Sequence, residues 1–166
     1  TNIDIKDLAG SKKNAVSGST YESQPCANPT YTASNGGALV FNGTSQCAYV
    51  PYLGSNFDKS ITLETWVKMP TGFSTGSSIF TQNDASTTSD INIVLGGSGY
   101  AAAGLRFQFR AGGASPTWPR PTNAITVVND TWMHIVGTYD GSNMKVYVNN
   151  VQTDTYTTSV GLAGGA

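Results

Sequence analysis

The fold is decided by residues 131–157, TWMHIVGTYDGSNMKVYVNNVQTDTYT. Apolar and polar residues alternate along this stretch in three runs, and a period of two is typical of β-strands with one buried face. The runs are separated by Asp140-Gly141-Ser142-Asn143 and by Asn149-Asn150, whose residue types tolerate the positive φ of tight hairpin turns. The sequence therefore predicts a three-stranded antiparallel meander between Trp132 and Tyr156.

The same alternation recurs toward the N-terminus, in short runs between clusters of Gly, Asn, Asp, Ser and Pro. No long stretch keeps a helical period, and alternation of this kind favours antiparallel sheets over parallel ones. The predicted fold class is therefore all-β. Strands are expected at residues 38–42, 48–50, 60–69, 78–82, 91–95, 104–111, 124–127, 131–139, 144–149 and 151–157, which is enough for two stacked sheets.

A length of 166 residues with 39% hydrophobic residues predicts a single domain. Within it, residues 1–35 are polar and turn-rich and are expected to wrap the sandwich as loops and short edge pieces. Residues 36–166 are expected to form the sandwich itself. The core between its sheets is predicted to contain Leu39, Phe41, Leu63, Val67, Phe107, Phe109, Ile135, Val146 and Val148.

Charged residues make up only 11% of the chain, against roughly 25% in an average soluble protein. Nine basic and ten acidic residues leave no electrostatic footprint for a phosphate backbone, so nucleic acid is not an expected partner. No apolar run approaches the ~20 residues that span a bilayer, so membrane insertion is not expected either.

Two cysteines, Cys26 and Cys47, lack the spacing of a zinc site. They form either a disulfide or two buried thiols in a reducing compartment. The composition, rich in Gly, Ser, Thr and Asn, is typical of secreted proteins and favours the disulfide. It also predicts an extracellular location, at a cell surface or on the surface of a virus particle.

Residues 130–141, DTWMHIVGTYDG, and residues 144–150, MKVYVNN, resemble laminin G-like members of the concanavalin A-like lectin/glucanase superfamily. Residues 38–44, 49–51 and 61–68 resemble the preceding strands of that family in the expected order, so the resemblance covers roughly residues 36–152. It implies a jelly-roll sandwich of two curved antiparallel sheets. Members bind glycans, bind proteins or hydrolyse glycosides, so the fold alone does not decide the function.

Domains of this family usually continue with a further glycine-rich strand pair, whereas this sequence stops at Gly164-Gly165-Ala166. A jelly roll without its closing strands exposes unpaired N–H and C=O groups, and such edges recruit other strands. The resemblance therefore implies either a longer natural chain or a segment of a neighbouring molecule that completes the sheet. Both outcomes describe a module of a larger chain or of an oligomeric assembly.

Catalysis is not predicted. A retaining glycosidase needs two carboxyl groups about 5 to 5.5 Å apart, at positions i and i+2 or i+4 of one strand, and Glu64 has no acidic neighbour at these positions. The single histidine, His134, lies in mid-strand and is predicted to make a hydrogen bond in the core or on a sheet face. Trp66 and Trp132 are likewise expected to pack in the core or on a sheet face.

Candidate ligand-binding residues lie in two places. Trp118 and Arg120 belong to the proline-rich residues 112–123, predicted as an exposed loop in which the ring stacks on a sugar and the guanidinium donates to hydroxyls. The alternative is a tryptophan that covers the edge of the sandwich. A second group, on the polar face of the strand at 104–111, is either a recognition patch or a plain solvated face, and comprises Arg106, Gln108 and Arg110.

A candidate calcium site lies between residues 82 and 90, because family members bind this ion through acidic and amide side chains in loops. Its predicted ligands are Asn83, Asp84 and Asp90, although their spacing matches no dedicated loop motif. Asn42 and Asn129 each begin an N-glycosylation sequon, which has a meaning only in a eukaryotic secretory host.

Two functions remain open from the sequence. The first is a non-catalytic binding or adhesion module that recognises carbohydrate on a secreted or surface protein. The second is a structural interaction module, such as a virion decoration, capsid or tail-fibre protein. The low-charge composition fits both, and the expected partners are accordingly glycans or other protein subunits.

Overall fold

The structure is a computed structural model that describes residues 4–5, 15–17, 26–49, 60–72, 78–82, 93–96, 105–108, 120–121 and 123–158. Nearly all of its regular structure is β-strand. The chain divides into two units, residues 1–53 and residues 54–166. Among the described residues, no helix has the length and apolarity to cross a membrane.

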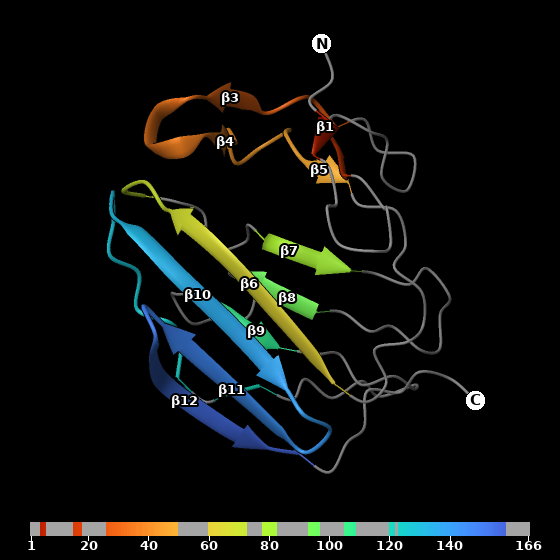
Figure 1. The fold of residues 1–166 in the computed structure, drawn as a ribbon, viewed down its shortest axis with the longest axis vertical. Coiled ribbons are helices and arrows are strands. Elements are labelled where there is room, and N and C mark those ends of the chain that lie inside the picture. The colour runs from red at the N-terminus through yellow and green to blue at the C-terminus, as the bar shows by residue number, and fades with distance from the viewer. Residues whose placement is uncertain are drawn as a thin grey trace, which may run out of the picture. The chain divides into compact units, whose positions relative to one another are not determined.

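The first unit contains short strands (Figure 1). β1 (Asp4–Ile5), β2 (Ala15–Ser17) and β5 (Ala48–Tyr49) form an antiparallel sheet in the order β1-β2-β5, and β3 (Thr30–Thr32) pairs antiparallel with β4 (Ala38–Val40). Between β3 and β4, Gly36 and Gly37 adopt φ angles of 85° and 100°, which glycine reaches without steric cost. These two residues let the chain reverse direction.

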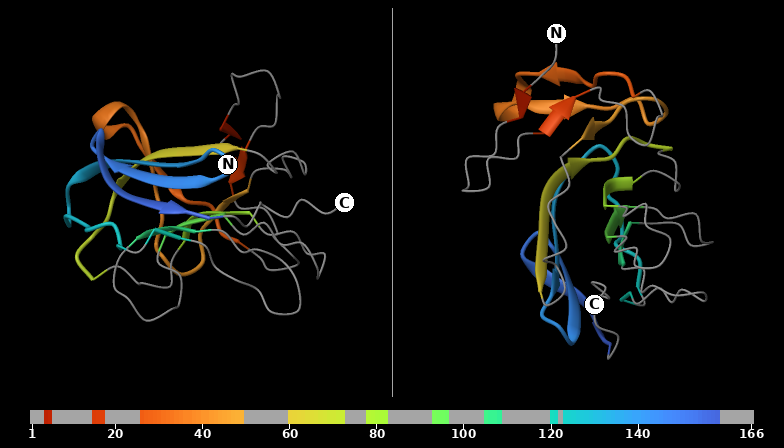
Figure 2. Two further views of the ribbon diagram at one scale, coloured as in Figure 1. Left: turned by 90° about the horizontal axis from the view of Figure 1, so that it is seen from below. Right: turned by 90° about the vertical axis from the view of Figure 1, so that its right-hand side faces the viewer.

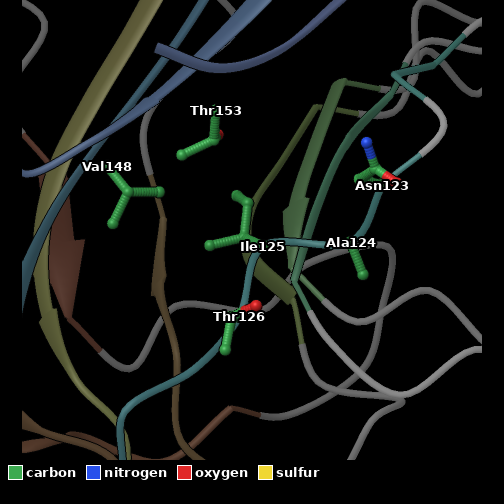
Figure 3. Close-up of a pocket in the computed structure, with 6 residues that line it drawn as sticks. All are labelled: Asn123, Ala124, Ile125, Thr126, Val148 and Thr153. Atoms are coloured by element: carbon green, nitrogen blue, oxygen red, sulfur yellow. The ribbon is translucent and has the colours of Figure 1, made fainter. Parts of the chain in front are cut away.

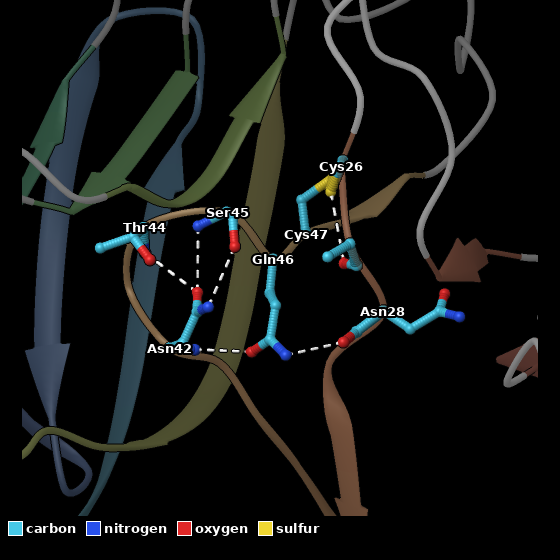
Figure 4. Close-up of a disulfide and its surroundings, with 8 residues drawn as sticks. Cys26, Asn28, Asn42, Thr44, Ser45, Gln46 and Cys47 are labelled. Carbon is cyan, nitrogen blue, oxygen red and sulfur yellow. Dashed lines mark hydrogen bonds between the residues drawn. A yellow bond between two sulfur atoms is a disulfide. The ribbon is translucent and has the colours of Figure 1, made fainter.

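A disulfide joins Cys26 to Cys47, the first of the two alternatives that the sequence left open (Figure 4). Beside it, the side chain of Gln46 connects two segments of the backbone. Its Nε2 donates to the carbonyl of Asn28 at 2.7 Å, and its Oε1 accepts the backbone N–H of Asn42 at 2.7 Å. The covalent link and these hydrogen bonds together fix the chain before β3 to the chain after β4.

The residues after β4 form a turn rather than a continuation of the strand. Oδ1 of Asn42 accepts the backbone N–H groups of Thr44 and Ser45, both at 3.0 Å, which is the hydrogen bonding of an Asx turn. Because the turn draws the chain out of the pairing with β3, Phe41 is 46% exposed. The prediction that Phe41 lies in the core is wrong, and Leu39 is only half-buried.

The second unit contains two antiparallel sheets that face each other around one core (Figures 1 and 2). The larger sheet has the order β12-β11-β10-β6 and comprises β6 (Ile61–Lys68), β10 (Trp132–Tyr139), β11 (Asn143–Val148) and β12 (Val151–Thr157). The smaller sheet has the order β7-β8-β9 and comprises β7 (Ser78–Gln82), β8 (Ile93–Gly96) and β9 (Arg106–Gln108). The predicted meander is confirmed, since β11 pairs with both β10 and β12.

The turn between β10 and β11 is stabilised by a carboxylate. Oδ1 of Asp140 accepts the backbone N–H groups of Asn143 at 2.7 Å and Ser142 at 2.9 Å, and Gly141 has a φ of 98°. These hydrogen bonds favour the charged form, so the donation from Asn143, followed by that from Ser142, holds the pKa of Asp140 below its ordinary value of 3.8. The carboxylate therefore stabilises the hairpin most when it is ionised.

This turn predicts a specific dependence of stability on pH. Because the pKa of Asp140 is lower in the folded than in the unfolded chain, its contribution is present above pH 3.8 and is lost as the pH falls through the folded value. Urea unfolding of the wild type and of Asp140→Asn between pH 7 and pH 2 should show their difference in stability shrinking below pH 3.8. A difference that stays constant over this range would refute the role given to the charge.

One predicted strand is wrong. Residues 124–127 form no strand and make a single antiparallel bridge, between Ile125 and Leu105, with the Ile125 N–H donating to the Leu105 carbonyl at 2.8 Å. The neighbouring backbone donors bind side chains instead: Asn123 donates to Asp154 at 2.7 Å, and Val128 donates to the sulfur of Met133 at 3.4 Å. The alternation of this segment reflects the burial of Ile125 and the packing of Val127 against the core, without strand pairing.

The core of the second unit is made by both sheets and by the segment around residue 125. Its buried residues are Leu105, Phe107, Ile125, Met133, Ile135, Tyr139, Met144 and Val146. Of the predicted core residues, Phe107, Ile135 and Val146 are buried, and Leu63, Val67 and Val148 pack partly buried against them. Phe109 lies outside the described residues.

Candidate functional site

The larger sheet has one face toward the core and one face away from it. Along β6 and β10 the two kinds of position alternate strictly, so every second side chain faces outward. We call the side facing away from the core the outer face. It includes Thr62, Glu64, Trp66 and Lys68 of β6, Trp132, His134, Val136 and Thr138 of β10, Lys145 and Tyr147 of β11, and Gln152 and Thr155 of β12.

An aromatic and charged cluster occupies this outer face where β6 and β10 pair. Trp66 lies directly opposite His134 in the register, and their rings stack with centroids 4.9 Å apart and planes 21° apart. Nε2 of His134 lies 2.8 Å from Oε1 of Glu64. Trp66 is 61% exposed and the Glu64 side chain 62% exposed, whereas the His134 side chain is only 13% exposed. The histidine therefore supports the two exposed groups.

The backbone of His134 is itself held by the turn after β11. Its N–H donates to Oδ1 of Asn149 at 2.9 Å, and its carbonyl accepts the N–H of Asn149 at 2.8 Å. Asn149 and Asn150 take φ angles of 49° and 67°, the left-handed conformation that asparagine tolerates best among residues with a side chain. The imidazole is thus held by Glu64 and Trp66 of β6, and the backbone that carries it is held by the turn after β11.

Such an arrangement suits a ligand with an apolar face and a polar edge. The histidine covers one face of the indole, while the high exposure of Trp66 leaves much of its surface open to a ligand. An exposed aromatic ring offers a flat apolar surface, and the carboxylate of Glu64 accepts hydrogen bonds from hydroxyl groups next to it. Lys68, two residues from Trp66 on the same face, adds a donor.

The polar face predicted for the strand at 104–111 is not observed at Gln108. This side chain is 1% exposed, and its neighbour Phe107 is also 1% exposed, so both faces of β9 are covered here. Arg106 is half-buried. The predicted exposed surface is therefore absent at Gln108. Other parts of the same chain cover this face of β9, although the alternation of residues assigned it to solvent. Arg110 lies outside the described residues.

The other predicted site residues are placed only in part. Arg120 is half-buried beside a buried Pro121, and Trp118 lies outside the described residues. The predicted calcium ligands also lie outside them: Asn83, Asp84 and Asp90. In the part of the chain that the structure describes, no group of three or more His, Cys, Asp and Glu residues could hold a metal ion.

The sequence pointed to the residues of the cluster but not to their role. The sheet-face hydrogen bond of His134 is confirmed by its contact with Glu64. Trp66 packs on the sheet face, as one of its two expected positions, yet most of its surface is open. The sequence did contain a signal for the exposure of Trp66. Along β6, Trp66 lies at the same alternate positions as the charged residues Glu64 and Lys68, and not at those of the apolar Leu63 and Val67.

Two antiparallel sheets around a shared core define this chain as an all-β jelly-roll sandwich. A family model described as the concanavalin A-like lectin/glucanases superfamily matches residues 31–166, and the chain belongs to that superfamily. The resemblance identified in the strands 38–44, 61–68 and 130–150 is thereby confirmed. No curated protein matches this chain.

A solved structure with a similar fold is domain 4 of AbnA, a GH43 extracellular arabinanase from Geobacillus stearothermophilus, in complex with arabinotriose. The two chains superpose with a TM-score of 0.68 at 19% sequence identity. The match covers 96% of this chain and 72% of that chain. At this identity the likeness concerns the fold.

Proposed function

We propose that this chain is a non-catalytic carbohydrate-binding module, and that its ligand lies on the outer face of the larger sheet against Trp66. The observation that carries this proposal is an indole that is 61% exposed and yet fixed in position by stacking on His134. Large aromatic side chains normally lose most of their exposed surface on folding, so one held open on a sheet face is a ready contact for a partner.

A fixed ring favours sugar binding for an energetic reason. Sugar rings carry C–H groups on one face, and covering that face and the indole removes apolar surface from water. Because the indole is already stacked on His134, whose backbone is held by Asn149, little side-chain freedom is lost when the ligand arrives. The hydroxyls at the edge of the sugar then reach Glu64 and Lys68, which lie beside Trp66 on β6.

The comparisons support the sugar class without identifying the sugar. The superfamily is named for lectins and glucanases, and the structurally similar domain was solved with arabinotriose. Among the outer-face residues that the structure describes, Glu64 is the single carboxylate, whereas glycoside hydrolysis requires a pair. The disulfide between Cys26 and Cys47 supports an extracellular location. The proposal does not depend on calcium, and the binding experiment below compares titrations with and without the ion.

The second candidate is a structural interaction module, and one observation favours it. The edge strand β12 begins with Val151, an apolar residue that is 65% exposed, and exposed strand edges pair with other chains. The exposed Trp66 would serve a protein partner as readily as a sugar. In that case the chain would associate with itself or with another subunit. Binding of free oligosaccharides separates the two candidates, since a protein interface has no reason to bind them.

Isothermal titration calorimetry against a panel of neutral oligosaccharides, with arabino-oligosaccharides first, tests the proposal. Each titration is run in calcium and again in EDTA. We expect saturable binding of at least one oligosaccharide and no release of reducing ends from the matching polysaccharide. Turnover that disappears in Glu64→Gln would make the chain an enzyme. Absence of binding across the panel, together with self-association in light scattering, would support the structural module instead.

A further inference from the structure

A second feature of the larger sheet lies on the side opposite Trp66. A hollow of about 260 Å³ opens between the end of β11, the start of β12 and residues 123–126 (Figure 3). Its lining consists of Asn123, Ala124, Ile125, Thr126, Val148 and Thr153. Val148 pairs with the buried Ile135, so it belongs to the core side of the sheet, away from the outer face.

A β-bulge in β12 forms one wall of this hollow. Val146 pairs with Asp154 and Tyr147 pairs with Gln152, so Thr153 is an extra residue without a partner in the register. Its hydroxyl donates to the carbonyl of Val146 at 3.3 Å, and its side chain faces the hollow in Figure 3. Bulges that aim a side chain in this way are frequent next to functional sites.

The opposite wall, residues 123–126, is held in place by two hydrogen bonds from its backbone. The backbone N–H of Asn123 donates to the carboxylate of Asp154 at 2.7 Å, which ties the segment to β12. Two residues later, Ile125 donates to Leu105 at 2.8 Å and is only 3% exposed. The hollow is therefore formed before any ligand arrives, because neither wall needs to move.

The lining has the chemistry of a site for an uncharged ring. Ile125 and Val148 provide an apolar floor, while the hydroxyls of Thr126 and Thr153 and the amide of Asn123 lie around it (Figure 3). None of the six lining residues is charged. The volume is below the roughly 300 to 1,000 Å³ of sites for drug-sized ligands, so the hollow suits one small ring rather than a chain.

We infer that the hollow is a second carbohydrate site, which binds a single uncharged sugar residue with its apolar face on Ile125 and Val148. The hydroxyls and the amide around the floor exchange hydrogen bonds with the sugar hydroxyls. This inference extends the proposed function to a second place on the chain. It does not require Trp66, which lies on the other side of the same sheet.

Saturation-transfer NMR with neutral methyl glycosides, one pyranose and one furanose series, tests the inference on the full chain. The Trp66→Ala protein is used as the background, so that the outer face contributes nothing. Within it, Thr153→Leu fills the mouth of the hollow, and Thr126→Leu does so from the other wall. Thr155→Leu is the matched control, since Thr155 is an exposed threonine of the same strand that does not line the hollow.

We expect at least one glycoside to bind the Trp66→Ala protein, and both filling variants to weaken that binding by about tenfold or more while the control leaves it unchanged. Equal affinities in Thr153→Leu, Thr126→Leu and Thr155→Leu would overturn the second site. Loss of all glycoside binding in Trp66→Ala alone would also overturn it, while leaving the site at Trp66 intact. A thermal melt of each variant identifies any that fails to fold.

Discussion

Phe107→Ala is expected to lower the free energy of unfolding by about 3 to 5 kcal/mol, as for other large aromatic side chains removed from a core. Phe107 belongs to β9 of the smaller sheet and is 1% exposed. Its ring lies against Gly137 of the larger sheet, where an added Cβ would stand 2.5 Å from Cδ2 of Phe107. The substitution therefore empties a place at which the two sheets are in close contact. Urea unfolding measures the change.

The reciprocal substitution at Gly137 is the control for this contact. Gly137→Ala inserts a methyl group where the phenyl ring already lies, and overpacking of this kind costs about 1 to 3 kcal/mol. In a Phe107→Leu background the same methyl group should be tolerated better, because the ring has gone. Additive effects of the two substitutions, or a loss below about 1 kcal/mol for Phe107→Ala, would contradict the close packing of the sheets.

Trp66→Ala is expected to weaken oligosaccharide binding about 30-fold or more, because truncating a central tryptophan typically costs at least 2 kcal/mol and each 1.4 kcal/mol is tenfold in affinity. The free energy of unfolding should change little, since Trp66 is 61% exposed. Calorimetric titration of the ligand found for the wild type measures the loss.

Tyr156→Ala is the matched control for this loss. Tyr156 is an exposed aromatic residue of the same sheet, 37% exposed, but it pairs with Met144 and so faces the side opposite Trp66. Its removal should leave the affinity unchanged. His134→Ala should weaken binding less than Trp66→Ala, because the indole stays present but loses the ring that holds it. Equal losses in the Trp66 and Tyr156 variants would remove the outer face from consideration.

Much of the second unit could be predicted from local pattern. The strands at 78–82 and 151–157 have the predicted bounds, and the hairpin residues Asp140 and Asn149 make the turns that their chemistry favours. Alternation and turn residues are local patterns of a few positions, so strands and hairpins that depend on them can be predicted from one sequence. The strands β1, β2 and β3 have at most three residues each, too few for a period to be visible, and they exist through pairing with distant residues.

The candidate site was less predictable because exposure depends on what covers each face. Alternation separated Gln108 from Phe107 but could not reveal that both would be buried. Alternation placed Trp66 on the polar side of its strand, but it could not show that the ring remains exposed to solvent. Most tryptophans are largely buried, so the exposure of this one was not expected. The stacking partner, His134, is 68 positions away and is brought to Trp66 only by the pairing of β6 with β10.

The most direct test of the site is the indole signal of Trp66 in an NMR titration of ¹⁵N-labelled protein with the bound oligosaccharide. The signal is assigned by its loss in Trp66→Phe. We expect the Nε1–H resonance of Trp66 to shift progressively and to saturate at the calorimetric Kd, together with the backbone amides of Glu64 and Lys68. An unmoved Trp66 signal at saturating ligand, with shifts at Trp118 instead, would contradict binding on the outer face and move the site to the loop at 112–123.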